Sequence, residues 1–440
     1  MKTMRKLFFN TLAVFFLGGL VSVVFATGTD LQKTYTWKYT INKGGSVAFD
    51  NYDCNLTIHI WDKGETEYRL TVDAEIRTEE DAAILDKYLQ NLKFSNNATS
   101  VSFSSSFWEN RNTIMGRMTM ELKDGKKIAL TEMNIKGELW IPSGCRFELT
   151  SKYSEINMDD FSGQLFLDLY NDNLYGAGVA GKAEITDKYS TIEFKEMKDL
   201  KADLYNTKLG TGNIGNLTAE SKYSKVTALT AGTLNINSYN DKYSFTRTGD
   251  VTFVAKYSDL KTESSGQIDL DCYEGSVVMN DIKDGRISSK YADFQFNGAE
   301  NISVVTSYND KLTVGKLNSL KITESKYCSW RIDDLKSSVT ESDGYEDKFT
   351  ILKTSQEFKE INITGKYVDI SVNLPKTTDF RFIAKIQYPK LEMDESLFKT
   401  RVKILESSKL EYDAVRGTER EGMPRVEVNG YQMSVKISEL

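Results

Sequence analysis

The chain holds few residues that could carry out a reaction. His59 is its only histidine, and Leu56, Ile58 and Ile60 alternate around it. This alternation places His59 on the outer face of a predicted strand. A Ser-His or Cys-His mechanism would depend on His59 alone, and no nucleophile motif accompanies it. We therefore expect an exposed strand residue here, and we predict no catalytic residue.

Carboxylates in turn-like segments are a second candidate for chemistry. Asp159 and Asp160 lie in "NMDD", Asp172 in "YNDN" and Asp310 in "YND". Some β-helix proteins cleave acidic polysaccharides with clustered carboxylates, calcium and a basic residue, and these aspartates could supply oxygen ligands. Asp and Asn also favour turns and tolerate unusual backbone angles. No Asp cluster interrupts the surrounding repeat, so turn chemistry is the favoured interpretation. We predict no metal and no cofactor.

The most regular feature of the sequence is a returning tyrosine. It occurs in two alternating settings, one preceded by lysine and the other usually followed by asparagine. The first class is Tyr153, Tyr189, Tyr223, Tyr257, Tyr291, Tyr327 and Tyr367. The second class is Tyr170, Tyr205, Tyr239 and Tyr308, with Tyr273 and Tyr345 followed by glutamate instead.

Apolar residues around both classes follow one rule. Two of them, seven residues apart, enclose each tyrosine, as Ile185 and Ile192 enclose Tyr189. The later member recurs at steps of 17 or 18 residues as far as Leu312, and further apolar residues tend to follow it at +2, +5, +8 and +10. Pairs two apart mark short strands, and the odd steps mark corners. The pattern predicts an all-β, single-stranded parallel β-helix (a β-solenoid) of ~17–18-residue coils.

Two units could instead form one larger coil of about 34 residues. Lysines such as Lys188 and Lys222 would then stack on successive strands, which is unfavourable for like charges. With one unit per coil, each lysine lies between two tyrosines, and its stem can cover an aromatic face. We prefer one unit per coil, so one corner column alternates Lys with Tyr and the next alternates Tyr with Asn or Glu.

These columns form the candidate surface, and two interpretations of it stay open. The rings could bind sugars by stacking, or they could be a structural ladder that protects the corners. The candidate residues are Lys188, Tyr189, Tyr205, Lys222, Tyr223, Tyr239, Lys256, Tyr257, Tyr273, Lys290, Tyr291 and Tyr308.

The solenoid repeats are predicted over residues 146–375, with a different region at each end. Residues 27–145 are β-rich with one helix at about 78–93, for which Thr78 is the predicted N-cap. Residues 376–440 form a C-terminal β cap in which "VEVNGYQMSV" repeats the spacing once more. The Pro-containing segments "IPSGCRFEL" and "LPKTTDFRF" are predicted to lie beside the stack.

Residues 1–26 have the pattern of a signal peptide, with a basic start, an apolar run and a small residue at Ala26. The expected location is therefore outside the cytoplasm: periplasm, outer surface or secreted. No later apolar stretch approaches the ~20 residues of a membrane span. Loss of Lys2, Arg5 and Lys6 would take the formal charge from −7 to −10, and the remaining charges are interspersed. An acidic chain without a basic patch argues against nucleic acid as a partner.

The four cysteines are widely scattered and include no CxxC, which argues against a zinc site. A bridge between Cys54 and Cys145 stays open. Cys272 and Cys328 are expected about three coils apart, ~14 Å at strand spacing, which is too far for a disulfide.

The chain also resembles a bacterial envelope family of β-solenoid "putative adhesin" domains. The resemblance rests on the signal peptide, "VAFDNYDCNLTIHIWD", "WIPSGCRFELTSKYSEI" and the iterated turns. It implies a surface or periplasmic location and no catalytic residues. The leading hypothesis is an exported, non-enzymatic protein for adhesion or scaffolding in the cell envelope, with cell-surface glycans or envelope proteins as partners. The alternative is a carbohydrate-active protein, either a polysaccharide binder or a polysaccharide lyase.

Overall fold

The computed structural model describes residues 29–114, 117–356 and 358–440. The predicted signal peptide, residues 1–26, lies outside this range. The described chain divides into two compact units, of which the first holds residues 29–32, 73–91 and the described part of 108–133, and the second holds the remainder. In the described part, no helix has the length and apolar character that crossing a membrane requires. The predicted division at residues 26, 145 and 375 stays a prediction.

The first unit contains the predicted helix. Helix α1 spans Glu79–Gln90, and the Thr78 side chain accepts a hydrogen bond from the amide of Asp81 at 3.1 Å. This confirms Thr78 as the N-cap. Strands β7 (Trp108–Ile114) and β8 (Arg117–Leu122) pair in antiparallel fashion, and β8 also pairs with the start of β9 (Lys127–Pro142).

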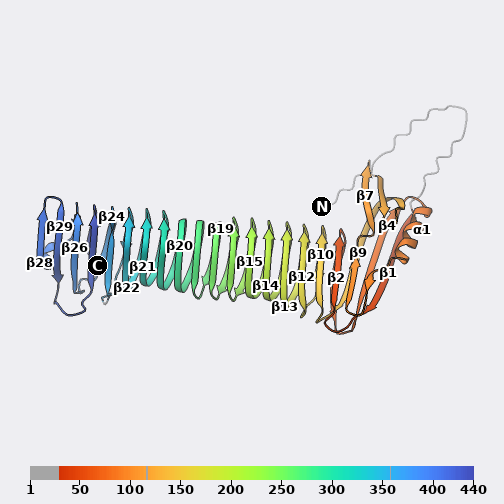
Figure 1. Ribbon diagram of the computed structural model, residues 1–440, viewed down its shortest axis with the longest axis horizontal. Helices are drawn as coiled ribbons and strands as arrows, with labels where there is room; N and C mark the ends of the chain where they lie inside the picture. The colour runs from red at the N-terminus through yellow and green to blue at the C-terminus, as the bar shows by residue number, and fades with distance from the viewer. Residues whose placement is uncertain (1–28, 115–116, 357) are drawn as a thin grey trace, which may run out of the picture. The chain divides into compact units, whose positions relative to one another are not determined.

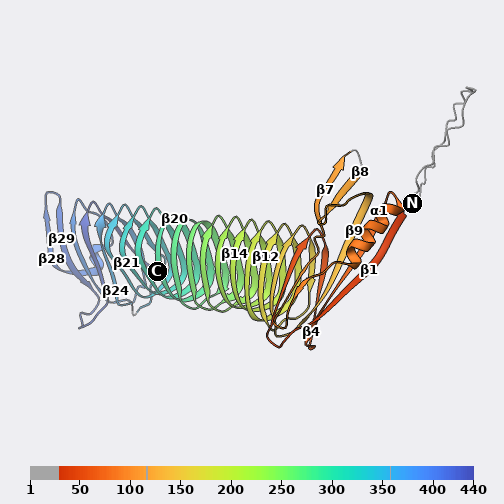
Figure 2. The same ribbon diagram turned by 45° about the vertical axis from the view of Figure 1, so that its right-hand side comes forward.

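The second unit is a parallel β-solenoid of about 13 turns with coils of ~18 residues, as the sequence predicts. Figures 1 and 2 show its coils stacked in chain order from β10 to β22. The strands of this run are β10 (Arg146–Lys152), β11 (Glu155–Met158), β12 (Gln164–Tyr170), β13 (Asn173–Lys188), β14 (Thr191–Tyr205), β15 (Lys208–Lys222), β16 (Lys225–Ala231), β17 (Leu234–Tyr239), β18 (Lys242–Thr248), β19 (Val251–Ser264), β20 (Ile268–Tyr308), β21 (Lys311–Lys326), β22 (Ser329–Tyr345), β23 (Lys348–Ile351), β24 (Glu360–Lys366) and β25 (Asp369–Leu374).

The solenoid core consists of inward-facing files of apolar side chains. Ile192 pairs with Leu209, and Leu209 pairs with Val226, in register on successive coils. All three side chains are buried. Phe194, Met197, Leu200 and Ala202 follow Ile192 at the predicted offsets and are buried as well. The 17-residue period therefore reflects one turn of chain around a shared apolar axis.

The N-terminal end of the solenoid is built out of sequence order. Strands β2 (Ser46–Tyr52) and β3 (Asn55–Trp61) form a coil that pairs with β10 and β11, 100 residues later in the chain. Phe49 lies against Leu149, and Leu56 against Ile156. On the outer side of this coil, β2 pairs with β6 (Ser100–Ser104) and β3 with β9. The other strands of this region are β1 (Thr29–Thr40), β4 (Glu65–Ile76) and β5 (Ser95–Asn96).

The C-terminal end also departs from sequence order. Strand β30 (Arg425–Tyr431) pairs in parallel with both β24 and β26 (Phe380–Gln387), so the last coil of the chain lies between two earlier ones. Strand β26 then pairs in antiparallel fashion with β29 (Lys409–Arg416), which pairs with β28 (Phe398–Glu406). Figure 1 shows β26, β29 and β28 side by side at the blue end. The remaining elements are β27 (Lys390–Glu392), a 3₁₀ helix (Glu395–Leu397) and β31 (Ser434–Glu439).

One structural prediction is wrong. The two Pro-containing segments do not lie beside the stack, because β10 and β26 continue directly from them and pair with coils on both sides. Phe147 and Phe380 are both buried in the core. The buried apolar side chains after each proline draw the segment into the stack.

Candidate functional site: the tyrosine ladder

One corner of the coil turns through a residue with positive φ. Along this corner column, φ lies between 52° and 71° in thirteen successive coils. A residue other than glycine in this left-handed region is disfavoured by about 1–2 kcal/mol. Asparagine tolerates it best, but tyrosine occupies alternate layers. The column is Tyr153, Asn171, Tyr189, Asn206, Tyr223, Asn240, Tyr257, Glu274, Tyr291, Asn309, Tyr327, Glu346 and Tyr367.

Tyrosine rings from this column and from the column before it form one continuous row, which we call the tyrosine ladder. Neighbouring rings meet edge to face, with centroids 5.4–5.8 Å apart and planes at 73–85°. Such contacts contribute about 0.5–1.5 kcal/mol each beyond area burial, which offsets the left-handed backbone. In spatial order the ladder is Tyr52, Tyr153, Tyr170, Tyr189, Tyr205, Tyr223, Tyr239, Tyr257, Tyr273, Tyr291, Tyr308, Tyr327, Tyr345, Tyr367, Tyr431 and Tyr388.

The ladder rings remain accessible although they touch one another. The tyrosines of the left-handed column are 41–47% exposed, and Tyr205, Tyr239 and Tyr273 are 36–37% exposed. Partial desolvation, followed by the adjacent phenols, raises the pKa of Tyr153, Tyr223 and Tyr291. These three rings therefore present neutral phenols with hydroxyl groups at physiological pH.

Lysines alternate with tyrosines along the corner, as the prediction of one repeat unit per coil requires. Lys188 lies in register between Tyr170 and Tyr205, and Lys222 between Tyr205 and Tyr239. Every candidate residue named from the sequence therefore belongs to this corner. Their role as a binding surface stays a prediction.

Tyr388 belongs to the ladder but was not predicted from the sequence. Ala384 and Leu391 enclose it with the same seven-residue spacing, so a signal was present. Its ladder neighbour is Tyr431, which lies later in the chain on the inserted coil.

Buried carboxylates fix the corner behind the ladder. Asp172 accepts hydrogen bonds from the Ser154 amide at 2.7 Å, the Ser151 hydroxyl at 3.1 Å and the Tyr170 amide at 3.1 Å. These contacts tie a ladder residue to the coil before it. Burial raises the pKa of Asp172 to about 6. Asp241 and Asp347 occupy the same column and bind serine hydroxyls and backbone amides in the same way.

Asp310 repeats this arrangement. It accepts from the Ala292 amide at 2.7 Å, the Tyr308 amide at 3.2 Å and the hydroxyls of Ser289 and Ser307. Burial raises its pKa. Asp172 and Asp310 thus have buried turn roles, as the favoured interpretation predicts. Over the described residues, no group of three His, Cys, Asp or Glu side chains is arranged to hold a metal ion.

His59 lies on the outer face of β3, as predicted. Its Nδ1 is 3.2 Å from Asp159 Oδ2, and its ring stacks on Trp140 with centroids 4.8 Å apart. Glu138 Oε1 lies 3.9 Å from Nε2. The two carboxylates come from different coils, so the sequence spacing could not show this grouping.

All four cysteines are free and buried, so Cys54 and Cys145 are not bridged. Burial raises the pKa of Cys54, Cys145 and Cys272 to about 12 and that of Cys328 to about 11. Because the thiolate is the reactive form, these thiols are unreactive at neutral pH.

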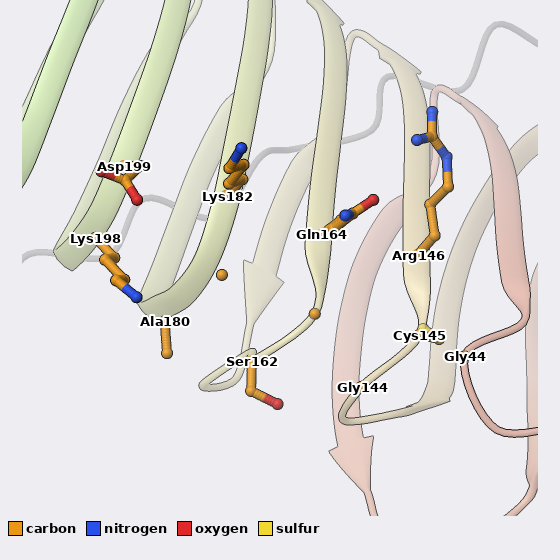
Figure 3. Close-up of a pocket in the computed structure, with 12 residues that line it drawn as sticks. Gly44, Gly144, Cys145, Arg146, Ser162, Gln164, Ala180, Lys182, Lys198 and Asp199 are labelled. Carbon is orange, nitrogen blue, oxygen red and sulfur yellow. The ribbon is translucent and has the colours of Figure 1, made fainter.

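A shallow hollow of about 500 Å³ lies at another turn of the first coils. Figure 3 shows Arg146 and Lys198 at its rim pointing in different directions. Arg146 donates to Glu148 at 2.6 Å, and its guanidinium lies 3.6 Å from the centre of the Phe166 ring. Asp199 accepts from Asn216 at 2.7 Å. The polar groups around this hollow therefore do not converge on a common point.

Comparisons with known proteins give no family. No family model matches the chain, and no curated protein does. A solved structure from Clostridium sporogenes ATCC 15579, described as a "putative cell adhesion protein", aligns over 93% of this chain and 100% of its own. The sequence identity is 8% and the TM-score is 0.15, and a similarity this low assigns neither a family nor a function.

Proposed function

We propose that this chain is an exported, non-enzymatic, adhesin-like protein that binds extended cell-surface glycans along its tyrosine ladder. The observation that carries the proposal is the ladder itself: a continuous row of part-exposed, edge-to-face tyrosines on a rigid solenoid. The predicted signal peptide supports a location in the periplasm, on the outer surface or outside the cell.

The chemistry of the ladder suits an extended chain of sugar rings. Each tyrosine offers an apolar ring and a hydroxyl group, and the alternate lysines add hydrogen-bond donors. A single such contact is weak. Contacts repeated along one rigid surface raise the overall affinity, because each later contact forms at high effective concentration.

The lyase alternative has less support. Asp172 and Asp310 direct their oxygens to buried amides and hydroxyls, and they lie many coils apart in one column. Their carboxylates are therefore engaged in holding the corner. Asp159 is engaged with His59 on another face. We therefore propose binding without turnover.

A glycan-array experiment on the chain without residues 1–26 tests the proposal. The informative variant replaces Tyr189, Tyr223 and Tyr257 with Asn, because Asn206 and Asn240 already occupy this left-handed column and the backbone accommodates them. Tyr175→Asn is the matched control, since Tyr175 is 43% exposed and its ring makes none of the ladder contacts. We expect the triple variant to lose glycan binding and the control to retain it.

Circular dichroism should show that both proteins are folded. Unchanged binding by the folded triple variant would leave the ladder with a structural role only. Release of unsaturated sugar products by the wild-type protein would support the lyase.

A further inference from the structure

Three lysines form a file beside the middle of the tyrosine ladder. Lys208, Lys225 and Lys242 occupy one position on successive coils, two residues after the left-handed corner. All three are exposed. Strand spacing places their backbones about 4.8 Å apart. Like charges directly opposite each other on neighbouring strands are destabilising.

Elsewhere in this column, lysines do not occupy neighbouring coils. Thr191 precedes the file and Asp259 follows it, and farther along Ser329 separates Lys311 from Lys348. Among the residues that the structure describes, no ion pair involves Lys208, Lys225 or Lys242. The three stacked lysines thus form no ion pair within the described structure, and Asp259, in register with Lys242 on the following coil, is the carboxylate at the end of the file.

The surface beside the lysine file carries short side chains, several of which have hydroxyl groups. Gly210, Thr227 and Ser244 occupy the next outward position in register. A shallow hollow of about 380 Å³ lies there, and its lining combines the hydroxyl residues Thr227, Ser244 and Thr246 with the apolar Leu229 and Phe245 and the charged Lys261 and Glu263. Glu193 lies next to Gly210 on the preceding coil, and Asp259 lies in register with Lys242 on the following coil.

The tyrosine ladder borders the other side of the file. Tyr205, Tyr223 and Tyr239 stack there, and Lys222 lies in register between Tyr205 and Tyr239. One strip of surface therefore combines aromatic rings, stacked cations and hydroxyl groups in the same three coils.

We propose that Lys208, Lys225 and Lys242 bind the carboxylate or sulfate groups of an acidic polysaccharide that lies along the ladder. This inference rests on the proposed glycan-binding function and adds the ligand's charge class. An acidic glycan supplies the missing counterions, while its rings contact the tyrosines.

Titration calorimetry with two matched polymers tests the inference. Polygalacturonate carries a carboxylate on every sugar, and its fully methyl-esterified form has the same backbone without the charge. We expect the wild-type chain lacking residues 1–26 to bind the acidic polymer about tenfold more tightly, as three exposed ion pairs allow. This preference should weaken as salt is added.

The variant that identifies the file is Lys208→Gln, Lys225→Gln and Lys242→Gln. It should lose the preference for the acidic polymer and keep its binding of the ester. The matched control is Lys311→Gln, Lys316→Gln and Lys348→Gln, which removes three exposed lysines that do not form a file. This control should keep the preference.

The outcomes separate the two proposals. Equal binding of both polymers by the wild type, or equal loss in both lysine variants, overturns the lysine file and leaves glycan binding standing. Failure to bind either polymer or any arrayed glycan overturns the function as well. A single-stranded DNA oligomer that binds as tightly as polygalacturonate also overturns the inference, because the file would then be a general polyanion site.

Discussion

Two turns of the same coil are held by opposite means. At the tyrosine corner, rings, serines and carboxylates from several coils hold a left-handed residue in place. At another turn, Gly181 and Gly232 lie where the preceding coil leaves no room for a side chain, whereas Lys198 occupies the equivalent position in the coil after Gly181. A Cβ at Gly181 would lie 1.8 Å from the Gly163 carbonyl oxygen, and one at Gly232 would lie 2.0 Å from that of Gly215.

This difference predicts how each turn responds to substitution. The tyrosine corner distributes its stability over many weak contacts, so one layer can change without loss of its neighbours. The glycine turn depends on backbone contact between coils, and a rigid backbone cannot move aside for a methyl group. The two turns should therefore differ in tolerance although they belong to the same coils.

The largest effect is expected at the glycine turn. Gly232→Ala should destabilise the protein by about 3 kcal/mol, because the new methyl group meets the backbone of the preceding coil. Gly210→Ala is the control, since its Cβ would lie 3.7 Å from its nearest neighbours and should change stability by less than about 1 kcal/mol. Urea unfolding of both variants measures the difference. Equal destabilisation would show that the contact between coils is not what requires glycine.

The second effect is a dependence on pH that arises behind the tyrosine corner. Burial raises the pKa of Asp172 to about 6, and burial together with the nearby Asp347 raises that of Glu341 to about 8. Both pKa values exceed the ordinary carboxyl pKa of about 4 that an unfolded chain has. The folded state therefore binds more protons than the unfolded state between about pH 4 and 8. Stability from these groups is therefore full at low pH and is lost as pH rises through about 6 and 8. Thermal unfolding should show a lower Tm at pH 9 than at pH 5.

Glu341→Gln sharpens this prediction. The side chain accepts one hydrogen bond from Ser325 at 2.6 Å, and in the described structure its Oε2 has no partner. Removal of the ionisable group should raise the Tm at pH 9 relative to the wild type and reduce the difference between the two pH values. A variant whose Tm depends on pH as the wild type does would assign that dependence to other groups.

The smallest effect is expected from a single ladder residue. Tyr223→Phe should be nearly neutral because both edge-to-face contacts persist, whereas Tyr223→Asn should cost about 1 kcal/mol. Tyr223→Ala loses the same ring contacts, and alanine tolerates the left-handed region less well than asparagine does. It should therefore cost more than Tyr223→Asn. Chemical denaturation ranks the three. An Asn variant as unstable as Ala would show that backbone preference contributes nothing here.

The repeat was predictable because the solenoid is a local structure. Ile192, Leu209 and Val226 are buried by neighbours one coil away in sequence, so a fixed spacing encodes a fixed position. The tyrosine and lysine columns followed from the same period. The out-of-sequence ends were not predictable by this means, because β2 finds its partner 100 residues away and β30 inserts between earlier coils.

The lysine file has the same period, since Lys208, Lys225 and Lys242 are 17 residues apart and the register of the coils makes them adjacent. The His59 group shows the limit from the side of function, because Asp159, which contacts it, lies 100 residues later in the chain.

The sequence by itself determined the period, the inward residues and the column of tyrosines, because each coil of the interior packs on its neighbours in the chain. The tertiary structure decided the left-handed corner, the edge-to-face geometry of the rings and the order of the terminal coils. The order of the terminal coils depends on contacts between residues whose separation follows no repeat. The corner and its ring geometry depend on backbone angles that a side-chain pattern does not specify.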